Sequence, residues 1–172
     1  MGKITFILGG ARSGKSSKAI SLAKENSNDV AFIATCQALD KEMARRIAAH
    51  KESRPAAWKT FECPKDIFSV LEHNGNQFEL VIIDCLTLWV SNLLLEGVKD
   101  KDIAEEIRRI VLALKKTNSD AIIVSNEVGL GIVPDNELGR VFRDIAGRVN
   151  QIVAEKADEV IFMVAGLPWR IK

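Results

Sequence analysis

The sequence has few cysteines and none of the spacings that hold structural metals. Its three cysteines, Cys36, Cys63 and Cys85, are odd in number, lie far apart and form no Cys-x-x-Cys pair. Neither a cysteine zinc site nor a disulfide framework is therefore expected. Free thiols are typical of a reducing compartment, so the sequence predicts a cytoplasmic protein.

Long hydrophobic runs and an excess of one charge are also missing. No apolar stretch reaches the roughly 18 residues that a membrane span needs, and no basic segment followed by an apolar one predicts a signal peptide. The 24 basic and 23 acidic side chains nearly cancel to a formal net charge of +1, without long blocks of one sign. Composition therefore gives no reason to expect a nucleic acid or a membrane as partner.

What the chain does have is a regular alternation of apolar runs and helical segments. Its 172 residues, 47% of them hydrophobic, can bury the core of one domain over 1–172. Buried strands are expected at 3–8, 30–35, 58–62, 80–84, 121–125 and 159–164, with a candidate edge strand at 168–172. Helices are expected at 16–24, 40–51 with Asp40 as N-cap, 64–73, 86–96, 103–116 and 136–156. This alternation predicts an α/β fold with a mostly parallel sheet and helices on both faces.

A phosphate-binding loop lies between the first expected strand and the first helix. It matches G-x-x-x-x-G-K-[ST] without exception and consists of Gly9, Gly10, Ala11, Arg12, Ser13, Gly14, Lys15 and Ser16. Its glycines let backbone N–H groups point at phosphate oxygens, and the helix that follows adds the positive end of its dipole. Lys15 is expected to reach the outer phosphates and Ser16 to bind Mg²⁺, while Arg12 either contacts phosphate or is solvated. The loop predicts nucleoside triphosphate binding on a P-loop NTPase-like (RecA-like) sheet.

A carboxylate ends one of the most apolar strands. Asp84 follows four buried residues, where an acid is costly unless it is paired or binds a metal. A P-loop protein usually carries a second Mg²⁺ ligand at the end of a strand beside the loop, and Asp84 is the candidate; a strand-end cap is the alternative. Asn126 and Glu127 follow the next apolar strand and should lie at the same ligand-binding edge of the sheet.

The chain has two histidines, both near expected helix ends. His73 lies beside Asn74, where its cation complements the helix dipole, which indicates a structural role. His50 lies in the last turn of the 40–51 helix, with Arg46 one turn before it on the same face. Considered alone, such a histidine is more often a helix-end residue than a catalyst.

Taken together, several segments resemble one family, the bifunctional adenosylcobinamide kinase/adenosylcobinamide-phosphate guanylyltransferases of cobalamin biosynthesis. The similarity covers essentially the whole chain. It is carried by the phosphate loop and by residues 32–35, 46–51, 54–55, 58, 126–129, 131–134, 142–151, 157–160 and 165–168. The histidine segment and the stretches 126–129 and 142–150 make it specific, since a phosphate loop alone does not.

The resemblance implies two reactions. In the first, the terminal phosphate of ATP or GTP passes to a hydroxyl of adenosylcobinamide, with Lys15 at the phosphates. In the second, GTP gives GMP to that phosphate through a guanylylated histidine, which matches His50 here, and pyrophosphate leaves. A neutral imidazole is a competent nucleophile near neutral pH.

Further site residues and an assembly are also implied by the resemblance. Thr35, Arg54, Glu62 and Asp84 would lie at the GTP site, where Glu62 can accept the N1 and N2 hydrogens of guanine. Arg46 or Lys51 either neutralises phosphate charge or is solvated. The family implies a homotrimer that acts on a corrinoid with GTP, ATP and Mg²⁺. The chain departs from the family pattern at Ala49, often a second histidine, and at Asp84, often glutamate.

Two other interpretations stay open from the sequence. One is a P-loop kinase or nucleotidyltransferase that performs only one of the two steps. The other is a GTPase switch, but the chain has no Asn-Lys-x-Asp for guanine, and no glycine closes an Asp-x-x-Gly motif after Asp84. These absences argue against the switch.

Overall fold

A single sheet organises the computed structural model of the protein, which describes residues 2–38, 41–52 and 54–172. The strand order in the described part is β3-β2-β4-β5-β1-β6-β7. All neighbouring strands are parallel except β7, which runs antiparallel to β6. The strands are β1 (Ile4–Gly9), β2 (Val30–Ala34), β3 (Lys59–Glu62), β4 (Leu80–Asp84), β5 (Asp120–Val124), β6 (Glu159–Val164) and β7 (Leu167–Arg170).

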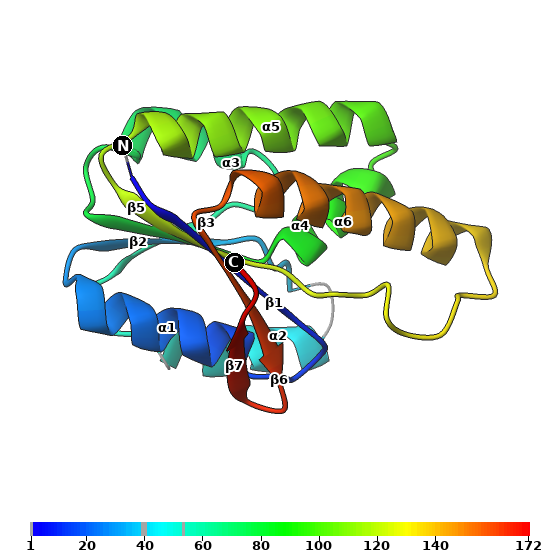
Figure 1. Ribbon diagram of the computed structural model, residues 1–172, viewed down its shortest axis with the longest axis horizontal. Helices are drawn as coiled ribbons and strands as arrows, with labels where there is room; N and C mark the ends of the chain where they lie inside the picture. Colours follow the sequence, from blue (N-terminus) through cyan, green and yellow to red (C-terminus); the bar gives the residue numbers. More distant parts are fainter. Residues whose placement is uncertain (1, 39–40, 53) are drawn as a thin grey trace.

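Helices cover both faces of this sheet (Figure 1). On one face lie α1 (Lys15–Asn26) and α2 (Lys41–Glu52). On the other lie α3 (Ile67–Asn74), α4 (Leu86–Leu95), α5 (Asp100–Lys116) and α6 (Glu137–Lys156). The predicted α/β fold with a mostly parallel, doubly covered sheet is therefore confirmed.

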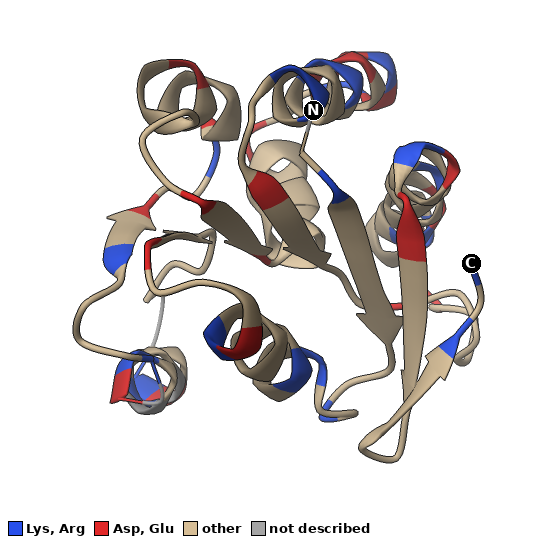
Figure 2. Ribbon diagram, turned by 60° about the vertical axis from the view of Figure 1, so that its left-hand side comes forward, with Lys and Arg blue, Asp and Glu red and all other residues tan. Residues whose placement is uncertain are grey.

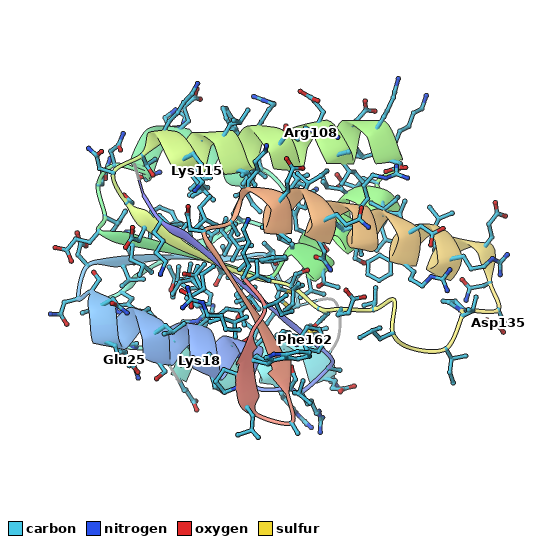
Figure 3. The ribbon with its side chains drawn as sticks, in the orientation of Figure 1. Lys18, Glu25, Arg108, Lys115, Asp135 and Phe162 are labelled. Atoms are coloured by element: carbon cyan, nitrogen blue, oxygen red, sulfur yellow. The ribbon has the colours of Figure 1, made fainter. Side chains whose placement is uncertain are left out.

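The apolar runs form strands because the sheet buries them from both sides. Every residue of β1 and β2 is buried, as a parallel sheet between helices requires. Alternate residues of each strand enter two separate cores, one under α1 and one under the four other helices. On the second face, α5 buries an apolar stripe at helical spacing, and Trp89 of α4 is fully buried. The side chains drawn in Figure 3 fill the space between sheet and helices.

The element bounds differ from the sequence prediction where local hydrogen bonds decide them. Helix α3 begins at Ile67 rather than at Pro64, because the Asp66 carboxylate caps it by accepting the Ser69 N–H at 3.1 Å. Helix α5 begins at Asp100, three residues before the predicted start. The candidate edge strand is present as β7. The predicted N-cap Asp40 lies outside the described residues. None of the described helices combines the length and apolarity that a membrane span needs.

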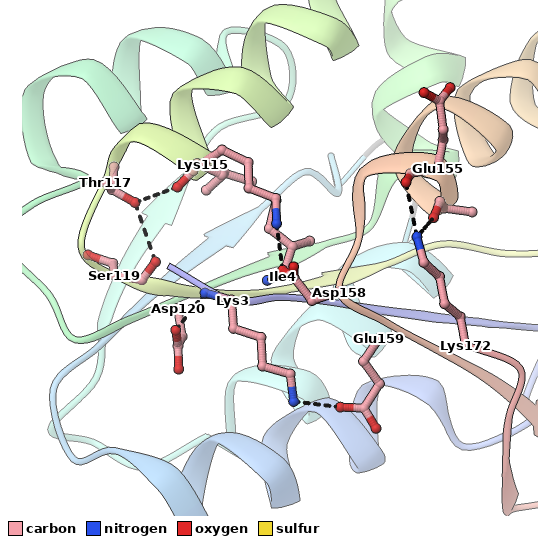
Figure 4. Close-up of polar contacts among 12 residues, drawn as sticks. Lys3, Ile4, Lys115, Thr117, Ser119, Asp120, Glu155, Asp158, Glu159 and Lys172 are labelled. Carbon is pink, nitrogen blue, oxygen red and sulfur yellow. Dashed lines mark hydrogen bonds and ion pairs between the residues drawn. The ribbon is translucent and has the colours of Figure 1, made fainter. Parts of the chain in front are cut away.

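Ion pairs tie together the amino ends of the strands, at the edge opposite the phosphate loop (Figure 4). Lys3 Nζ lies 2.8 Å from Glu159 Oε2, and Lys115 Nζ lies 2.6 Å from Asp158 Oδ2, which also accepts the Ile4 N–H at 2.7 Å. Elsewhere basic and acidic side chains alternate over the outer helices (Figure 2). The charged contacts of this edge are structural, and the carboxyl edge of the sheet is where a ligand site is expected.

Candidate active site

The carboxyl ends of five neighbouring strands bring the predicted site residues to one edge of the sheet. The strand register places Glu62, Ala34, Asp84 and Val124 in one row across β3, β2, β4 and β5, level with Ile7 of β1. The phosphate loop leaves β1 two residues later. Residues that are far apart in the sequence are therefore neighbours here.

Two glycines of the phosphate loop hold backbone shapes that other residues would strain. Gly9 has φ 152°, and a Cβ there would lie 2.6 Å from the Met163 carbonyl oxygen. Gly14 has φ 91° and precedes the first residue of α1. The loop is also tied to the β6–β7 turn, where the Gly166 N–H donates to the Ser13 carbonyl at 3.1 Å. The chain can therefore turn from strand to helix with its amides close to a ligand.

Lys15 folds back over the phosphate loop rather than extending into solvent. Its side chain is 7% exposed, and Nζ donates to the Gly10 carbonyl at 2.6 Å and to Ser13 Oγ at 3.5 Å. Burial lowers the pKa of Lys15, while negative charge at Cys85 and Asp84 opposes that shift. A buried ammonium held by one carbonyl can exchange that partner for phosphate oxygens.

Asp84 is the point where the site residues meet. Burial raises its pKa, and four neighbours oppose that shift: the Ser16 hydroxyl by hydrogen bonding, and His50, Arg54 and Lys15 by their charge. One expectation is corrected, because β4 does not pair with the loop strand β1; β5 lies between them. Asp84 nevertheless reaches the loop, since it interacts with Ser16 at the start of α1.

The oxygens of Ser16 and Asp84 form a pair suited to Mg²⁺. Mg²⁺ prefers hard oxygen ligands and is usually held by one or two carboxylates together with substrate phosphates. A hydroxyl and a carboxylate that lie together beside a phosphate loop fit that chemistry. The predicted assignment of these two residues is therefore consistent with the geometry.

The histidine segment lies over the same edge. His50 is in the last turn of α2, with an exposed side chain, and its charge acts on Asp84. The neighbouring Lys51 forms an ion pair with Glu62 of β3. The side chain of Arg46, the other predicted cation, lies outside the described residues. Helix α2 thus brings a histidine and a lysine towards the strand ends.

Arg54 is a cation with unused hydrogen-bond donors. Its guanidinium carbon lies 3.6 Å from the centre of the Phe32 ring, and its Nε and Nη1 are buried without a hydrogen-bond partner among the residues that the structure describes. Burial lowers the pKa of Arg54, and the charges of Asp84 and Glu62 oppose the shift. Unpaired buried donors are rare and costly, so this arrangement suits an anionic ligand.

A cavity of about 420 Å³ opens beside this arginine. It is lined by Lys51, Arg54, Pro55, Ala56, Trp58, Thr60 and Glu62. The lining combines carboxylate, cation and ring surfaces, which is the mixture that a nucleotide base and its phosphates need.

Thr35 serves the site from inside the protein. Its side chain is 0% exposed, and Oγ1 donates to the Cys85 carbonyl at 2.7 Å and accepts the Cys85 N–H at 2.8 Å. Cys85 follows Asp84 through a cis peptide bond. The Thr35 carbonyl in turn accepts from the Asn92 amide at 2.8 Å. Thr35 therefore holds the segment after Asp84, and its hydroxyl is fully used within the protein.

A second polar cluster, which sequence reasoning missed, holds the loop after β5. The Thr87 hydroxyl lies 3.2 Å from Ser125 Oγ and accepts the Asn126 N–H at 2.6 Å. Asn150 of α6 donates to the Asn126 carbonyl at 3.0 Å, and the Glu127 N–H donates to the Gly9 carbonyl at 3.0 Å. Polar residues on the buried faces of apolar helices were the available signal in the sequence.

We expect Asp84→Asn to make the protein no less stable at neutral pH while lowering activity. The folded pKa of Asp84 is above its ordinary 3.8, so folding disfavours the carboxylate. The stability that the protonated acid contributes is fully present below the unfolded pKa and is lost as pH rises through the folded value. The gain from Asp84→Asn should therefore grow from about pH 4 to about pH 7 in urea unfolding. A loss of stability that is equal at both pH values would contradict this account, and Glu79→Gln serves as control.

Solved structures with a similar fold are P-loop ATPases. One is titled as an ATPase domain, with a TM-score of 0.52 and 15% identity, covering 93% of this chain and 68% of that one. Another is a prototypical ATPase of a bacterial type III secretion system, with a TM-score of 0.63 and 12% identity, covering 95% and 51%. At such identities the likeness concerns the fold alone. Fold and loop together define a P-loop nucleotide-binding protein of the RecA-like type.

Sequence comparison gives the family. Residues 5–171 match the family described as cobinamide kinase / cobinamide phosphate guanyltransferase. A bifunctional adenosylcobalamin biosynthesis protein, CobP, of Pseudomonas aeruginosa is 46% identical, covering 97% of this chain and 96% of its own. Its counterpart CobU of Salmonella typhimurium is 42% identical, covering 97% and 98%. The chain belongs to this family of bifunctional kinases and guanylyltransferases of cobalamin biosynthesis.

Proposed function

We propose that one nucleotide site serves both reactions, with His50 as the carrier of GMP. The observation that carries this proposal is the convergence on Asp84 of the loop residues Lys15 and Ser16 with His50 and Arg54. Phosphate-binding groups and a nucleophile are thus near each other, as transfer of a nucleotidyl group requires.

In the first reaction a hydroxyl of the corrinoid attacks the γ-phosphorus of ATP or GTP. The bond between the γ-phosphorus and the bridging oxygen breaks, the nucleoside diphosphate leaves, and the hydroxyl proton passes to a base or to water. Such transfers depend mainly on positioning and on charge. Lys15 and the loop amides supply both, since Lys15 can exchange the Gly10 carbonyl for a phosphate oxygen.

In the second reaction a ring nitrogen of His50 attacks the α-phosphorus of GTP. A nitrogen–phosphorus bond forms, the bond to the bridging oxygen breaks, and pyrophosphate leaves. The phosphate made in the first reaction then attacks the same phosphorus, which releases the histidine and gives adenosylcobinamide-GDP. The histidine divides one difficult displacement into two easier ones. Arg54, with its unpaired donors, would neutralise charge on the reacting phosphates.

Ser16 and Asp84 are the residues that would hold Mg²⁺ in this scheme. A bound Mg²⁺ neutralises charge on the phosphate oxygens. The chain's own part is to place a hydroxyl and a carboxylate beside the loop that carries those phosphates.

We place the guanine base in the cavity beside Glu62. A carboxylate there can accept the N1 and N2 hydrogens of guanine, which adenine cannot offer in the same pattern. Lys51 pairs with Glu62 across the cavity and would move to phosphate when the base binds. We expect the reactions in the cytoplasm, because the three cysteines are free thiols.

The proposed function is tested by following each phosphorus of GTP into product. Purified protein is incubated with adenosylcobinamide, Mg²⁺ and GTP labelled at either the γ- or the α-phosphorus. We expect γ-label first in adenosylcobinamide phosphate, then α-label in adenosylcobinamide-GDP, with release of pyrophosphate. If only one label enters the corrinoid, the protein performs one step and the bifunctional proposal fails.

We also propose that the protein is a homotrimer. Two apolar surfaces lie on different parts of the molecule (Figures 1 and 3), one on the loop before α6 that carries Asp135 and one on the β6–β7 hairpin beside Phe162. The exposed residues are Leu130, Ile132, Val133 and Leu138 on the first surface, and Val164, Leu167, Trp169 and Ile171 on the second. Two different surfaces that bind each other generate a ring. Sedimentation equilibrium should give three chain masses, and a monomer would contradict this.

A further inference from the structure

Asn126, at the carboxyl edge, has a backbone that the protein holds on both sides and a side chain that it leaves unused. The Asn126 N–H donates to Thr87 Oγ1 at 2.6 Å, and its carbonyl accepts from Asn150 Nδ2 at 3.0 Å. Its side-chain amide makes no hydrogen bond to any residue that the structure describes, and it is partly exposed. A fixed backbone with a free amide is the arrangement of a residue that contacts a ligand.

The sheet register places this amide beside the phosphate loop. The Ser125 N–H donates to the Ile7 carbonyl and the Glu127 N–H to the Gly9 carbonyl, both at 3.0 Å, so the ladder between β1 and β5 continues past Val124. By that register Asn126 is level with Gly9, the first residue of the loop. Alternation gives it the face of Val124, the face that α1 covers.

Asp84 shares that face, because it alternates with Ile82, which packs under α1. Strand β5 lies between the loop strand β1 and β4, the strand of Asp84. Asn126 therefore lies between Lys15 with its loop on one side and the Asp84 carboxylate on the other. The phosphates of a nucleotide bound to the loop extend into this space.

The residues beside Asn126 cannot take the same part. Ser125 is buried, and its hydroxyl is engaged with Thr87. Glu127 carries a negative charge, which would repel phosphate, and its carboxylate accepts the Gly129 N–H at 2.7 Å. Asn126 is the neutral member of the three whose two amide hydrogens are available.

We propose that the Asn126 side-chain amide donates a hydrogen bond to the terminal phosphate of the nucleoside triphosphate, and that Thr87 and Asn150 position it through its backbone. The proposal rests on binding of a triphosphate at the phosphate loop. It does not depend on which group is transferred afterwards. Asn126 thereby distinguishes a triphosphate from a diphosphate.

The test compares triphosphate and diphosphate binding by calorimetry for wild type, Asn126→Ala and Asn126→Asp. Guanosine nucleotides with a methylene bridge between the α- and β-phosphorus, and for the triphosphate also between the β- and γ-phosphorus, are used, so that neither reaction can proceed and a failure of catalysis does not affect the result. For Asn126→Ala we expect the Kd of the triphosphate to rise at least about tenfold. The Kd of the diphosphate should stay within about twofold.

Asn126→Asp has the same shape but places a carboxylate against phosphate, so its loss of triphosphate binding should exceed that of Asn126→Ala. Both variants should melt near the wild type, because no described residue accepts from this amide. Unchanged triphosphate binding, or an equal weakening of both nucleotides, would overturn the proposal. Loss of product without a change in these two constants would count against the proposed function instead.

Discussion

Replacing His50 by alanine should abolish retention of α-label on the protein. Wild type incubated with Mg²⁺ and α-labelled GTP, then denatured, is expected to carry label that acid removes and base does not, as a phosphoramidate behaves. His50→Ala removes the nucleophile itself, so we expect label to fall at least about a thousandfold. Transfer of γ-phosphate to adenosylcobinamide should change by less than about tenfold, because that step forms no bond to His50.

His73→Ala is the matched control for this experiment. His73 also lies in the last turn of a helix, is exposed, and has Nδ1 2.7 Å from the Ser69 carbonyl oxygen, away from the strand ends. It should retain label fully. If His50→Ala retains label, or if the wild type binds GTP and takes up none, the guanylylated residue is not His50.

The order of strands and helices could be predicted from the sequence because its signals are local. Apolar runs of four to six residues, the glycine loop and the strand-end Asp84 each lie within a short window. Chemistry was also readable where one residue type permits few uses, as in the phosphate loop. Helix starts were less certain, since a single side chain such as Asp66 decides where α3 begins.

Contacts between distant segments could not be predicted in this way. Thr35 was expected at the nucleotide, but its hydroxyl bonds to the backbone of Cys85, 50 positions away in the chain. Thr87 and Asn150 looked like ordinary helix residues, although both hold Asn126. Their roles depend on the placing of β5 between β1 and β4, which no local pattern in the sequence reveals.

The site also shows how stability is set against function. Burial raises the pKa of Asp84 and lowers that of Lys15, so folding disfavours the charged form of both. Arg54 carries buried donors without partners among the described residues. A nucleotide with its phosphates would supply the missing partners, and binding should therefore raise the melting temperature of the wild type.

Lys15→Met should remove both activities. The ammonium is the loop's own positive charge, and its long side chain carries it to the outer phosphates, where charge gathers in both the γ-transfer and the loss of pyrophosphate. We expect kcat for each reaction to fall at least about a thousandfold, measured with the same two labels. Lys24→Met, an exposed lysine in the last turn of the same helix, should leave both rates within about twofold.

The fold should survive this change, which separates a catalytic loss from an unfolded protein. Because burial lowers the pKa of Lys15, the folded state disfavours its charge, and a neutral side chain of similar length is not expected to destabilise it. The melting temperature of Lys15→Met without nucleotide should therefore equal or exceed that of the wild type, while the rise on adding GTP should be lost. A variant that keeps either reaction would show that the loop lysine does not act on the phosphates in that step.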